Sequence, residues 1–228
     1  MNLVIDVGNS FVKLAVFEGT TPLTKKTVKP EYILKQVDLL RNEYPLIQRA
    51  IISSVGSLKR TDIAYLNNHF NLIQLDSSTK LPFKNRYETP KTLGIDRIAL
   101  VSASVHQYPN SDVLIIDVGT CITYDFVTSK NEYLGGAISP GIRMRYQSLN
   151  NLTAKLPLLE TETPQSLIGN STNSSIHSGV VFGILKEIDG IIEEYQLKYK
   201  DLTVILTGGD ANFLSKQLKS SIFANSNF

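Results

Sequence analysis

The sequence has a single cysteine, Cys121, and no tryptophan among its 228 residues. One cysteine excludes an intramolecular disulfide and any zinc site built from several cysteines of one chain. No apolar run approaches the length that crosses a bilayer. The first residues, Met1–Asp6, lack the basic start of a secretory signal. We therefore expect a soluble, cytoplasmic protein.

An excess of charge of one sign is also lacking. Lysine and arginine total 23 against 21 aspartate and glutamate residues, which leaves a net charge of +2. Because positive and negative charges are nearly balanced, we do not expect a protein that binds a nucleic-acid backbone or an anionic membrane. With 42% hydrophobic and 19% charged residues, the composition is typical of a globular protein. The length allows one large domain or two small lobes.

Several common functional motifs are absent. The sequence has no G-x-x-x-x-G-K-[ST] loop, no G-x-G-x-x-G fingerprint and no H-E-x-x-H motif. Its histidines, His69, His106 and His177, do not have the spacing of metal ligands. If the protein uses ATP, it must hold the phosphates with a different kind of turn.

An internal repeat is the most informative feature present. The run LVIDVGNS at Leu3–Ser10 recurs as LIIDVGTC at Leu114–Cys121. Each copy is an apolar run, then an Asp, then a glycine turn, and a second β-type run follows it, at Phe11–Phe17 and Ile122–Val127. The pattern predicts a buried strand, a tight turn and a second strand, with an acid at the base of the turn.

The remainder of each half alternates between segments with helical spacing of apolar residues and short β-type runs. Apolar residues keep helical spacing at 32–40, 59–70, 95–106, 175–195 and 212–219, and short β-type runs lie at 50–53, 72–75 and 202–206. Alternating strands and helices predict an α/β fold. The turn-rich segment Pro109–Asp112 lies just before the second copy of the repeat. It predicts two lobes, 1–110 and 111–228.

The two acidic turns favour phosphate binding. A single Asp-x-Gly is common in ordinary turns, but two in register are harder to explain structurally, because burying an unpaired acid is costly. Turn N–H groups and small polar side chains suit a polyphosphate, and the carboxylates suit a bridging cation. We expect the two turns to face each other across a cleft. Lys13 is either a solvated lysine or a phosphate contact.

Asp96 and Arg97 form the most interesting local cluster. Asp96 is expected in the first turn of a helix, where the helix dipole favours an anion. It could serve only there or act as a general base. Arg97 could pair on the surface or bind an anionic group. The pattern alone does not choose, and the loop around Tyr87 could line the same pocket.

Two glycine-rich segments have similar alternatives. Gly135–Gly141 is either a plain loop or a shaped turn that lines a site. Thr207–Ala211 is expected to end a strand and to begin a helix with Asp210 as its N-cap. Its paired glycines would also let a ligand approach the backbone closely.

Six segments in order resemble the type III pantothenate kinase family, a branch of the acetate kinase–sugar kinase–actin superfamily. Cys121 stands where that family usually has alanine, and its members usually carry a further short apolar segment beyond Ile222–Phe223. The matching segments are Asp6–Lys13 (D-x-G-N-[ST]-x-x-K), Gly94–Arg97 (G-x-D-R), Asp117–Asp125 (D-x-G-T-A-x-T-x-D), Gly135–Gly141 (G-G-x-I-x-P-G), Gly169–Thr172 (G-x-x-T) and Thr207–Ala211 (T-G-G-D-A).

The resemblance implies a two-lobed, actin-like (ribonuclease H-like) α/β fold, with duplicated domains, mixed central sheets and a nucleotide cleft between the lobes. It implies ATP-dependent phosphorylation of the primary hydroxyl of pantothenate, the first step of coenzyme A biosynthesis. The implied cofactors are ATP with Mg²⁺ and a monovalent cation, potassium or ammonium. The implied assembly is a homodimer with substrate pockets near the subunit interface.

The resemblance also implies roles for particular residues. Asp96 would be the general base, and Asp117 would bind the monovalent cation. The ATP phosphates would be held by Asp6, Val7, Gly8, Asn9, Ser10, Phe11, Val12, Lys13 and Thr120. Pantothenate would be contacted by Tyr87, Gly94, Ile95, Asp96, Arg97 and Thr172.

Two other functions on the same fold remain open. A non-catalytic regulatory protein would bind nucleotide and leave Asp96 without a role. A phosphohydrolase would have to position water rather than an alcohol, and would leave the cluster from Tyr87 to Arg97 unexplained.

Overall fold

The computed structural model describes residues 1–8, 11–54, 58–76 and 79–224. Contacts divide the chain into two compact units, Met1–Lys80 with Lys91–Ala99 and Leu81–Pro90 with Leu100–Phe228. Helix α3 (Ile95–Gln107) begins in the first unit and ends in the second. This division follows packing, whereas the predicted boundary between residues 110 and 111 follows the sequence repeat. The domain boundary therefore stays a prediction.

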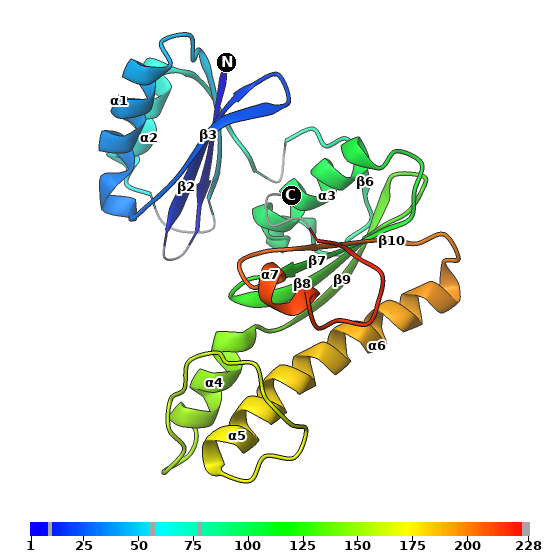
Figure 1. Cartoon of the computed structure of the whole chain (residues 1–228). Helices are drawn as coiled ribbons and strands as arrows, with labels where there is room; N and C mark the ends of the chain where they lie inside the picture. Colours follow the sequence, from blue (N-terminus) through cyan, green and yellow to red (C-terminus); the bar gives the residue numbers. More distant parts are fainter. Residues whose placement is uncertain (9–10, 55–57, 77–78, 225–228) are drawn as a thin grey trace. The chain divides into compact units, whose positions relative to one another are not determined.

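The first unit is built on a mixed sheet of order β3-β2-β1-β4-β5. Strand β1 pairs antiparallel with β2 and parallel with β4. Figure 1 shows α1 and α2 beside these strands. The elements are β1 (Asn2–Val7), β2 (Val12–Glu18), β3 (Thr21–Val28), a 3₁₀ turn (Pro30–Tyr32), α1 (Ile33–Glu43), β4 (Arg49–Ser54), α2 (Arg60–His69) and β5 (Asn71–Gln74).

The core of the first unit lies on one face of this sheet. Alternate residues of β1, namely Leu3, Ile5 and Val7, are fully buried and pack with α1 and α2 in one cluster. Because successive side chains of a strand point to opposite faces, Asp6 lies on the other face. The uninterrupted apolar run thus gives a strand that is fully buried on one face only.

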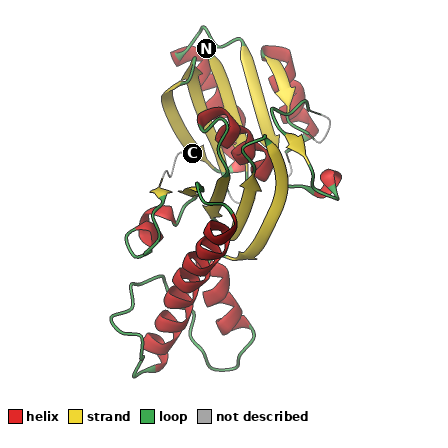
Figure 2. Ribbon diagram, turned by 90° about the vertical axis from the view of Figure 1, so that its right-hand side faces the viewer, coloured by secondary structure: helices red, strands yellow, loops and turns green. Residues whose placement is uncertain are grey.

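The second unit carries a six-stranded sheet of order β11-β10-β7-β8-β9-β6. Figure 2 shows its strands together with the long helix α6. The elements are β6 (Lys84–Asn85), β7 (Val113–Val118), β8 (Cys121–Val127), β9 (Glu132–Pro140), α4 (Ile142–Asn151), α5 (Thr172–His177), a π-helical turn (Ser178–Phe182), α6 (Gly183–Lys198), β10 (Thr203–Thr207), α7 (Ala211–Ser215) and β11 (Phe223–Ala224). A 3₁₀ turn (Pro90–Thr92) begins at the last residue of the segment Leu81–Pro90 and continues in the first unit.

The two sheets repeat one topology. Strand β7 pairs antiparallel with β8 and parallel with β10, as β1 does with β2 and β4. The order β9-β8-β7-β10-β11 therefore repeats β3-β2-β1-β4-β5, and the predicted duplicated α/β architecture with mixed sheets is confirmed. The second hairpin is one residue shorter, because Val118 pairs with Ile122 where Val7 pairs with Val12.

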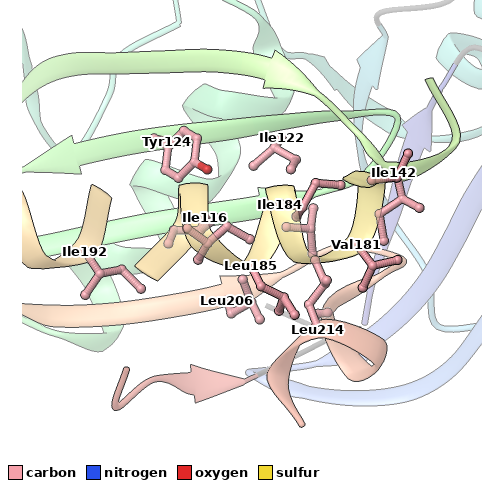
Figure 3. Packing of buried hydrophobic residues seen from close by; sticks show 14 of the residues in the cluster. Ile116, Ile122, Tyr124, Ile142, Val181, Ile184, Leu185, Ile192, Leu206 and Leu214 are labelled. Carbon is pink, nitrogen blue, oxygen red and sulfur yellow. The ribbon is translucent and has the colours of Figure 1, made fainter. Parts of the chain in front are cut away.

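The larger hydrophobic core lies between the second sheet and α6. Ile116 and Tyr124 from the strands pack in one cluster with Ile184 and Leu185 of α6, and Leu214 of α7 belongs to the same cluster (Figure 3). Strand β7 is buried on both faces over most of its length, as its uninterrupted apolar run predicts. Helices α4 and α5 lie near the N-terminal end of α6 (Figure 1).

The prediction of a turn or loop at Gly135–Gly141 is wrong, because strand β9 runs through Pro140. Its glycines serve the sheet. Gly135 has φ +102° beside the register shift in the β8–β9 pair. A Cβ at Gly136 would lie 1.7 Å from the carbonyl oxygen of Tyr124. Glycine therefore marks close backbone approach here rather than chain reversal.

Other local expectations differ in smaller ways. The edge strand β3 was not predicted, because it is largely exposed and its polar sequence shows no alternation. Asp210 precedes α7 as expected, but its side chain makes no capping hydrogen bond. Within the described ranges, no helix is both long and apolar enough to span a membrane.

We expect Gly136→Ala to destabilise the protein strongly, because the added methyl group would overlap the Tyr124 carbonyl. Gly190→Ala is the matched control. Gly190 lies within α6 with nothing within 4 Å of its Cβ position, so alanine there should stabilise by about 1 kcal/mol. Thermal unfolding followed by circular dichroism measures both changes. Equal melting temperatures for the two variants would contradict the role given to Gly136.

Candidate functional site

The first acidic turn follows β1. The Oδ1 atom of Asp6 accepts a hydrogen bond of 2.8 Å from the hydroxyl of Ser53, on the parallel neighbour β4. At the turn itself, the backbone N–H of Gly8 donates to the carbonyl of Phe11 at 3.0 Å. Asp6 is thus held on its strand by a neutral donor, which leaves its charge available to a cation or to a second donor.

Lys13 stands directly opposite Asp6 in the β1–β2 pair, so both side chains project from the same face of the sheet. Lys13 is exposed. By contrast, the side chains of Val7 and Val12 are buried in the core, so any contact they make with a ligand must come from their backbones. Phe11 is 52% exposed. The expected phosphate contacts Asn9 and Ser10 lie outside the described residues.

The second acidic turn follows β7 and is packed more tightly. Asp117 ends the apolar part of the strand, and the loop after the parallel strand β10 passes directly against it. Gly208 has φ +98°, and a Cβ there would lie 2.3 Å from Asp117 Oδ1 and 2.7 Å from the Val118 backbone. Asp210 then donates its backbone N–H to the Val118 carbonyl at 3.1 Å. Only glycine fits between the carboxylate and this backbone.

Burial also acts on Asp210. It raises the pKa of the Asp210 carboxyl above its ordinary value, because burial disfavours the charged form.

Thr120 is exposed in the turn itself, between Gly119 and Cys121. Gly141, at the start of α4, donates its N–H to the Thr120 carbonyl at 3.1 Å. The second turn is therefore packed against backbone from β10 on one side and from the β9–α4 junction on the other.

The cluster from Gly94 to Arg97 begins helix α3, as predicted. The Gly94 carbonyl accepts from Ile98 N–H at 3.1 Å, and Asp96 lies in the first turn. The Asp96 carboxylate is exposed, and its Oδ1 accepts from the Arg97 N–H at 2.9 Å. Arg97 itself is only 5% exposed. Ile95 precedes this pair and is partly buried. The carboxylate is thus oriented and solvent-accessible, as a proton acceptor requires.

Tyr87 belongs to the second unit, where it packs on β9. Its ring stacks on Tyr133 with centroids 6.1 Å apart, and a Cβ at Gly135 would lie 3.1 Å from it. Tyr133 donates its hydroxyl to the buried carboxylate of Asp125 at 2.7 Å, and Thr123 donates to the other oxygen at 3.1 Å. Tyr87 is therefore held by a glycine and an aromatic ring fixed through a buried acid.

Thr172 is the first residue of α5. It lines a pocket of about 810 Å³ within the second unit. Ser171 caps the helix through a reciprocal pair of hydrogen bonds with Ser174. Arg145, Ser148 and Asn170 also line this pocket. Thr172 thus lies at a hollow with both apolar walls and hydrogen-bonding groups.

The oxygen atoms around Asp117 are compatible with a bound cation. Its carboxylate is an oxygen ligand, and carbonyl oxygens of the turn lie nearby, since a Cβ at Gly119 would be 3.7 Å from Asp117 Oδ1 and equally far from the Cys121 carbonyl. Oxygen donors of this kind suit hard cations. Within the part of the chain that the structure describes, no group of three or more His, Cys, Asp or Glu side chains is arranged to bind a metal ion.

Comparison with known proteins decides the family. A model of the type III pantothenate kinase family matches residues 2–194. A type III pantothenate kinase of Christiangramia forsetii is 52% identical over 228 residues, which is 100% of this chain and 94% of that protein. The chain belongs to the type III pantothenate kinase family.

Solved structures agree on the fold of this family member. A Baf family protein of Campylobacter jejuni superposes with a TM-score of 0.64 at 22% identity, covering 98% of this chain and 91% of that one. A ROK family glucokinase of Streptomyces griseus gives a TM-score of 0.51 at 10% identity, over 98% and 93% of the two chains. At these identities the likeness concerns the fold alone, which is the actin-like α/β fold expected from the sequence.

Several contacts around the expected residues were not predicted from the sequence. Ser53 was read only as part of a strand, although its place at the end of a parallel neighbour could have paired it with Asp6. Gly208 was expected to admit a ligand, but it first makes room for Asp117. Arg145 and Glu187 gave no local signal, because they lie far apart in the sequence and meet only in the folded unit.

We expect Gly208→Ala to lower the free energy of unfolding by at least about 1–3 kcal/mol, because φ +98° is strained for a residue with a Cβ. The methyl group would also displace the Asp117 carboxylate. Gly209→Ala is the adjacent control, since nothing lies within 4 Å of its Cβ position, and it should change stability by less than about 0.5 kcal/mol. Urea denaturation of the nucleotide-free variants compares them. Similar losses in both would contradict this packing.

Proposed function

We propose that this protein transfers the γ-phosphoryl group of ATP to the primary hydroxyl of pantothenate, the first step of coenzyme A biosynthesis. The observation that carries the proposal is the family match, which spans residues 2–194 and is joined by 52% identity over the full chain to a protein named for this activity. We also propose the cytoplasm as the location of the reaction, because ATP is available there.

The first unit supplies residues suited to ATP phosphates. Asp6 and Lys13 project side by side from one face of the sheet, so a lysine ammonium and a carboxylate are presented together. The ammonium would pair with phosphate oxygens, and the carboxylate would hold the Mg²⁺ that accompanies ATP. Gly8 and Phe11 form the adjoining turn. Through their backbones, Val7 and Val12 maintain its geometry, and Asn9 and Ser10 complete the assigned segment.

The second unit supplies Thr120 and Asp117. The exposed Thr120 hydroxyl would donate a hydrogen bond to a phosphate oxygen. Asp117, with the turn carbonyls near it, would hold a potassium or ammonium ion. That cation would offset the negative charge of the phosphates. The role of the chain here is to fix oxygen ligands in place, because Gly208 and the Val118 backbone restrict where the carboxylate can point.

Asp96 is assigned as the general base. The hydroxyl oxygen of pantothenate attacks the γ-phosphorus, the new O–P bond forms, and the bond from phosphorus to the β–γ bridging oxygen breaks to release ADP. The hydroxyl proton passes to the Asp96 carboxylate. In phosphoryl transfer such a base mainly positions the alcohol, and a positioned base typically contributes about 10²–10⁴ in rate.

The remaining assigned residues would bind pantothenate. Arg97 would form an ion pair with the pantothenate carboxylate, and Tyr87 would offer an aromatic surface. Gly94 and Ile95 would shape the backbone beside the base. Thr172 would donate from the wall of the pocket described above.

We also propose that the protein is a homodimer. Support comes from large apolar side chains exposed around α4 and α5, where Leu152 is 83%, Leu167 is 73% and Ile168 is 82% exposed. Large apolar side chains exposed to this degree favour a surface that contacts another protein.

The kinase proposal predicts ADP release that requires pantothenate and that falls by about 10²–10⁴ in kcat for Asp96→Asn. Asp62→Asn is the matched control, because Asp62 is an acid in the first turn of α2, a helix of the same unit. A coupled ADP assay with and without pantothenate measures both. ADP release indifferent to pantothenate would favour a phosphohydrolase, and tight nucleotide binding without turnover would favour a regulatory protein.

The cation assignment predicts that Asp117→Asn raises the potassium concentration needed for half-maximal activity by about tenfold or more, since a charged ligand is lost. Potassium should also raise the melting temperature of the wild type in the presence of ATP, and this shift should shrink in the variant. Asp201→Asn, at an exposed turn before β10, is the control. An unchanged potassium dependence in Asp117→Asn would place the cation elsewhere.

A further inference from the structure

A polar cluster in the second unit connects two helices to the end of strand β9. On α4, Arg145 donates from Nε to the Pro140 carbonyl at 2.9 Å and from a terminal nitrogen to the Ser139 hydroxyl at 3.0 Å. The same guanidinium pairs with the Glu187 carboxylate of α6. Tyr124 of β8 donates its hydroxyl to the other Glu187 oxygen at 2.9 Å. Four elements of the chain thus meet at one ion pair.

The residue that follows Pro140 rests on the second acidic turn. Gly141 donates its N–H to the Thr120 carbonyl at 3.1 Å, and its own carbonyl accepts from Arg145 N–H at 3.1 Å. A Cβ at Gly141 would lie 2.4 Å from the carbonyl oxygens of both Gly119 and Thr120. Any shift of the β9–α4 junction must therefore move the turn that carries Thr120.

The contacts around the Arg145–Glu187 ion pair keep Glu187 ionised and hold both side chains in position. Arg145 and Glu187 are 22% and 24% exposed in their side chains, so they are shielded more than a surface pair. Burial raises the pKa of Glu187, but hydrogen bonds from Arg145, Ser139 and Tyr124 outweigh it and leave that pKa below its ordinary value. Burial also raises the pKa of Tyr124, which keeps its hydroxyl protonated as the donor.

We propose that Arg145, held by Glu187 and Tyr124, is a positioning residue that fixes the β9–α4 junction against the Gly119–Thr120 turn and thereby sets the affinity of that turn for the phosphates of ATP. The inference rests on the proposed function, because it takes this turn as a phosphate contact. Arg145 acts through the junction rather than on the nucleotide. Because Arg145 also lines the pocket at Thr172, the selective loss of ATP affinity is expected for Glu187→Gln, whose side chain does not line that pocket.

The test compares variants of this ion pair with variants of an exposed ion pair, between Arg143 of α4 and Glu160 of the loop that follows α4. Arg145→Met and Glu187→Gln should each weaken binding of a non-hydrolysable ATP analogue about tenfold, as expected when a charge-assisted hydrogen bond is lost. The KM for ATP should rise in both variants. In Glu187→Gln the KM for pantothenate should stay within about twofold, because Glu187 does not line the pocket at Thr172. Arg143→Met and Glu160→Gln are the controls. They remove a pair that is 65% and 79% exposed and should change neither value.

Two further variants separate positioning from mere stability. The double variant Arg145→Met with Glu187→Gln should bind the analogue no more weakly than the worse single variant, because contacting residues of one cluster are not additive. Arg145→Lys should restore part of the affinity, since lysine keeps the charge but not the planar fork. It also retains the partner charge of Glu187, which keeps the test informative if Arg145→Met does not fold.

The outcomes distinguish this inference from the proposed function. If the wild type binds the analogue but releases no pantothenate-dependent ADP, the proposed function fails while analogue affinities still test the role of Arg145. Additive losses, or parallel rises in KM for both substrates in Glu187→Gln with a lowered melting temperature, would show a general structural role and overturn the inference. Unchanged analogue affinity in folded Arg145→Met would overturn it as well.

Discussion

In both units, a carboxylate lies at the end of the central strand, and the parallel neighbouring strand or the loop after it must accommodate that carboxylate. Asp6 is received by the Ser53 hydroxyl from the parallel strand β4. Asp117 packs closely against the backbone of Gly208, which follows the parallel strand β10. The sheet order, with one antiparallel and one parallel neighbour on the central strand, brings a hairpin turn and a strand end to the same carboxylate. Without that order, Asp6 would lose its Ser53 donor and the loop at Gly208 would not lie against Asp117.

The two units use this arrangement differently. The first is more open, with Lys13 exposed opposite Asp6. In the second unit, the shorter hairpin places Thr123 opposite Asp117. Thr123 is neutral, and its hydroxyl donates a hydrogen bond to the buried Asp125. The repeat thus preserves backbone topology while exchanging a lysine for a neutral hydroxyl. Such a division suits one turn that pairs directly with phosphate and another that relies on a bound cation, which is the distribution of roles proposed above.

Local patterns predicted much of the fold because they reflect local physics. The apolar run of β7 and the helical spacing of α1 and α3 each appear as expected, since burial of one face follows directly from the spacing of apolar residues. Strand β3 was missed because an exposed edge strand needs no apolar face. Gly135–Gly141 was misread because glycine serves turns and close strand packing equally, and only the neighbouring strand shows which applies.

The sequence by itself determined the duplicated α/β pattern, the two acids at the strand ends and the family resemblance, because each is written in consecutive residues. Tertiary structure alone decided what surrounds those acids. The contact of Gly208 with Asp117 depends on sheet order, and the meeting of Arg145 with Glu187 depends on how α4 and α6 pack. These are contacts between residues far apart in the chain. Their geometry is set by the packing of whole elements, which no short stretch of sequence encodes.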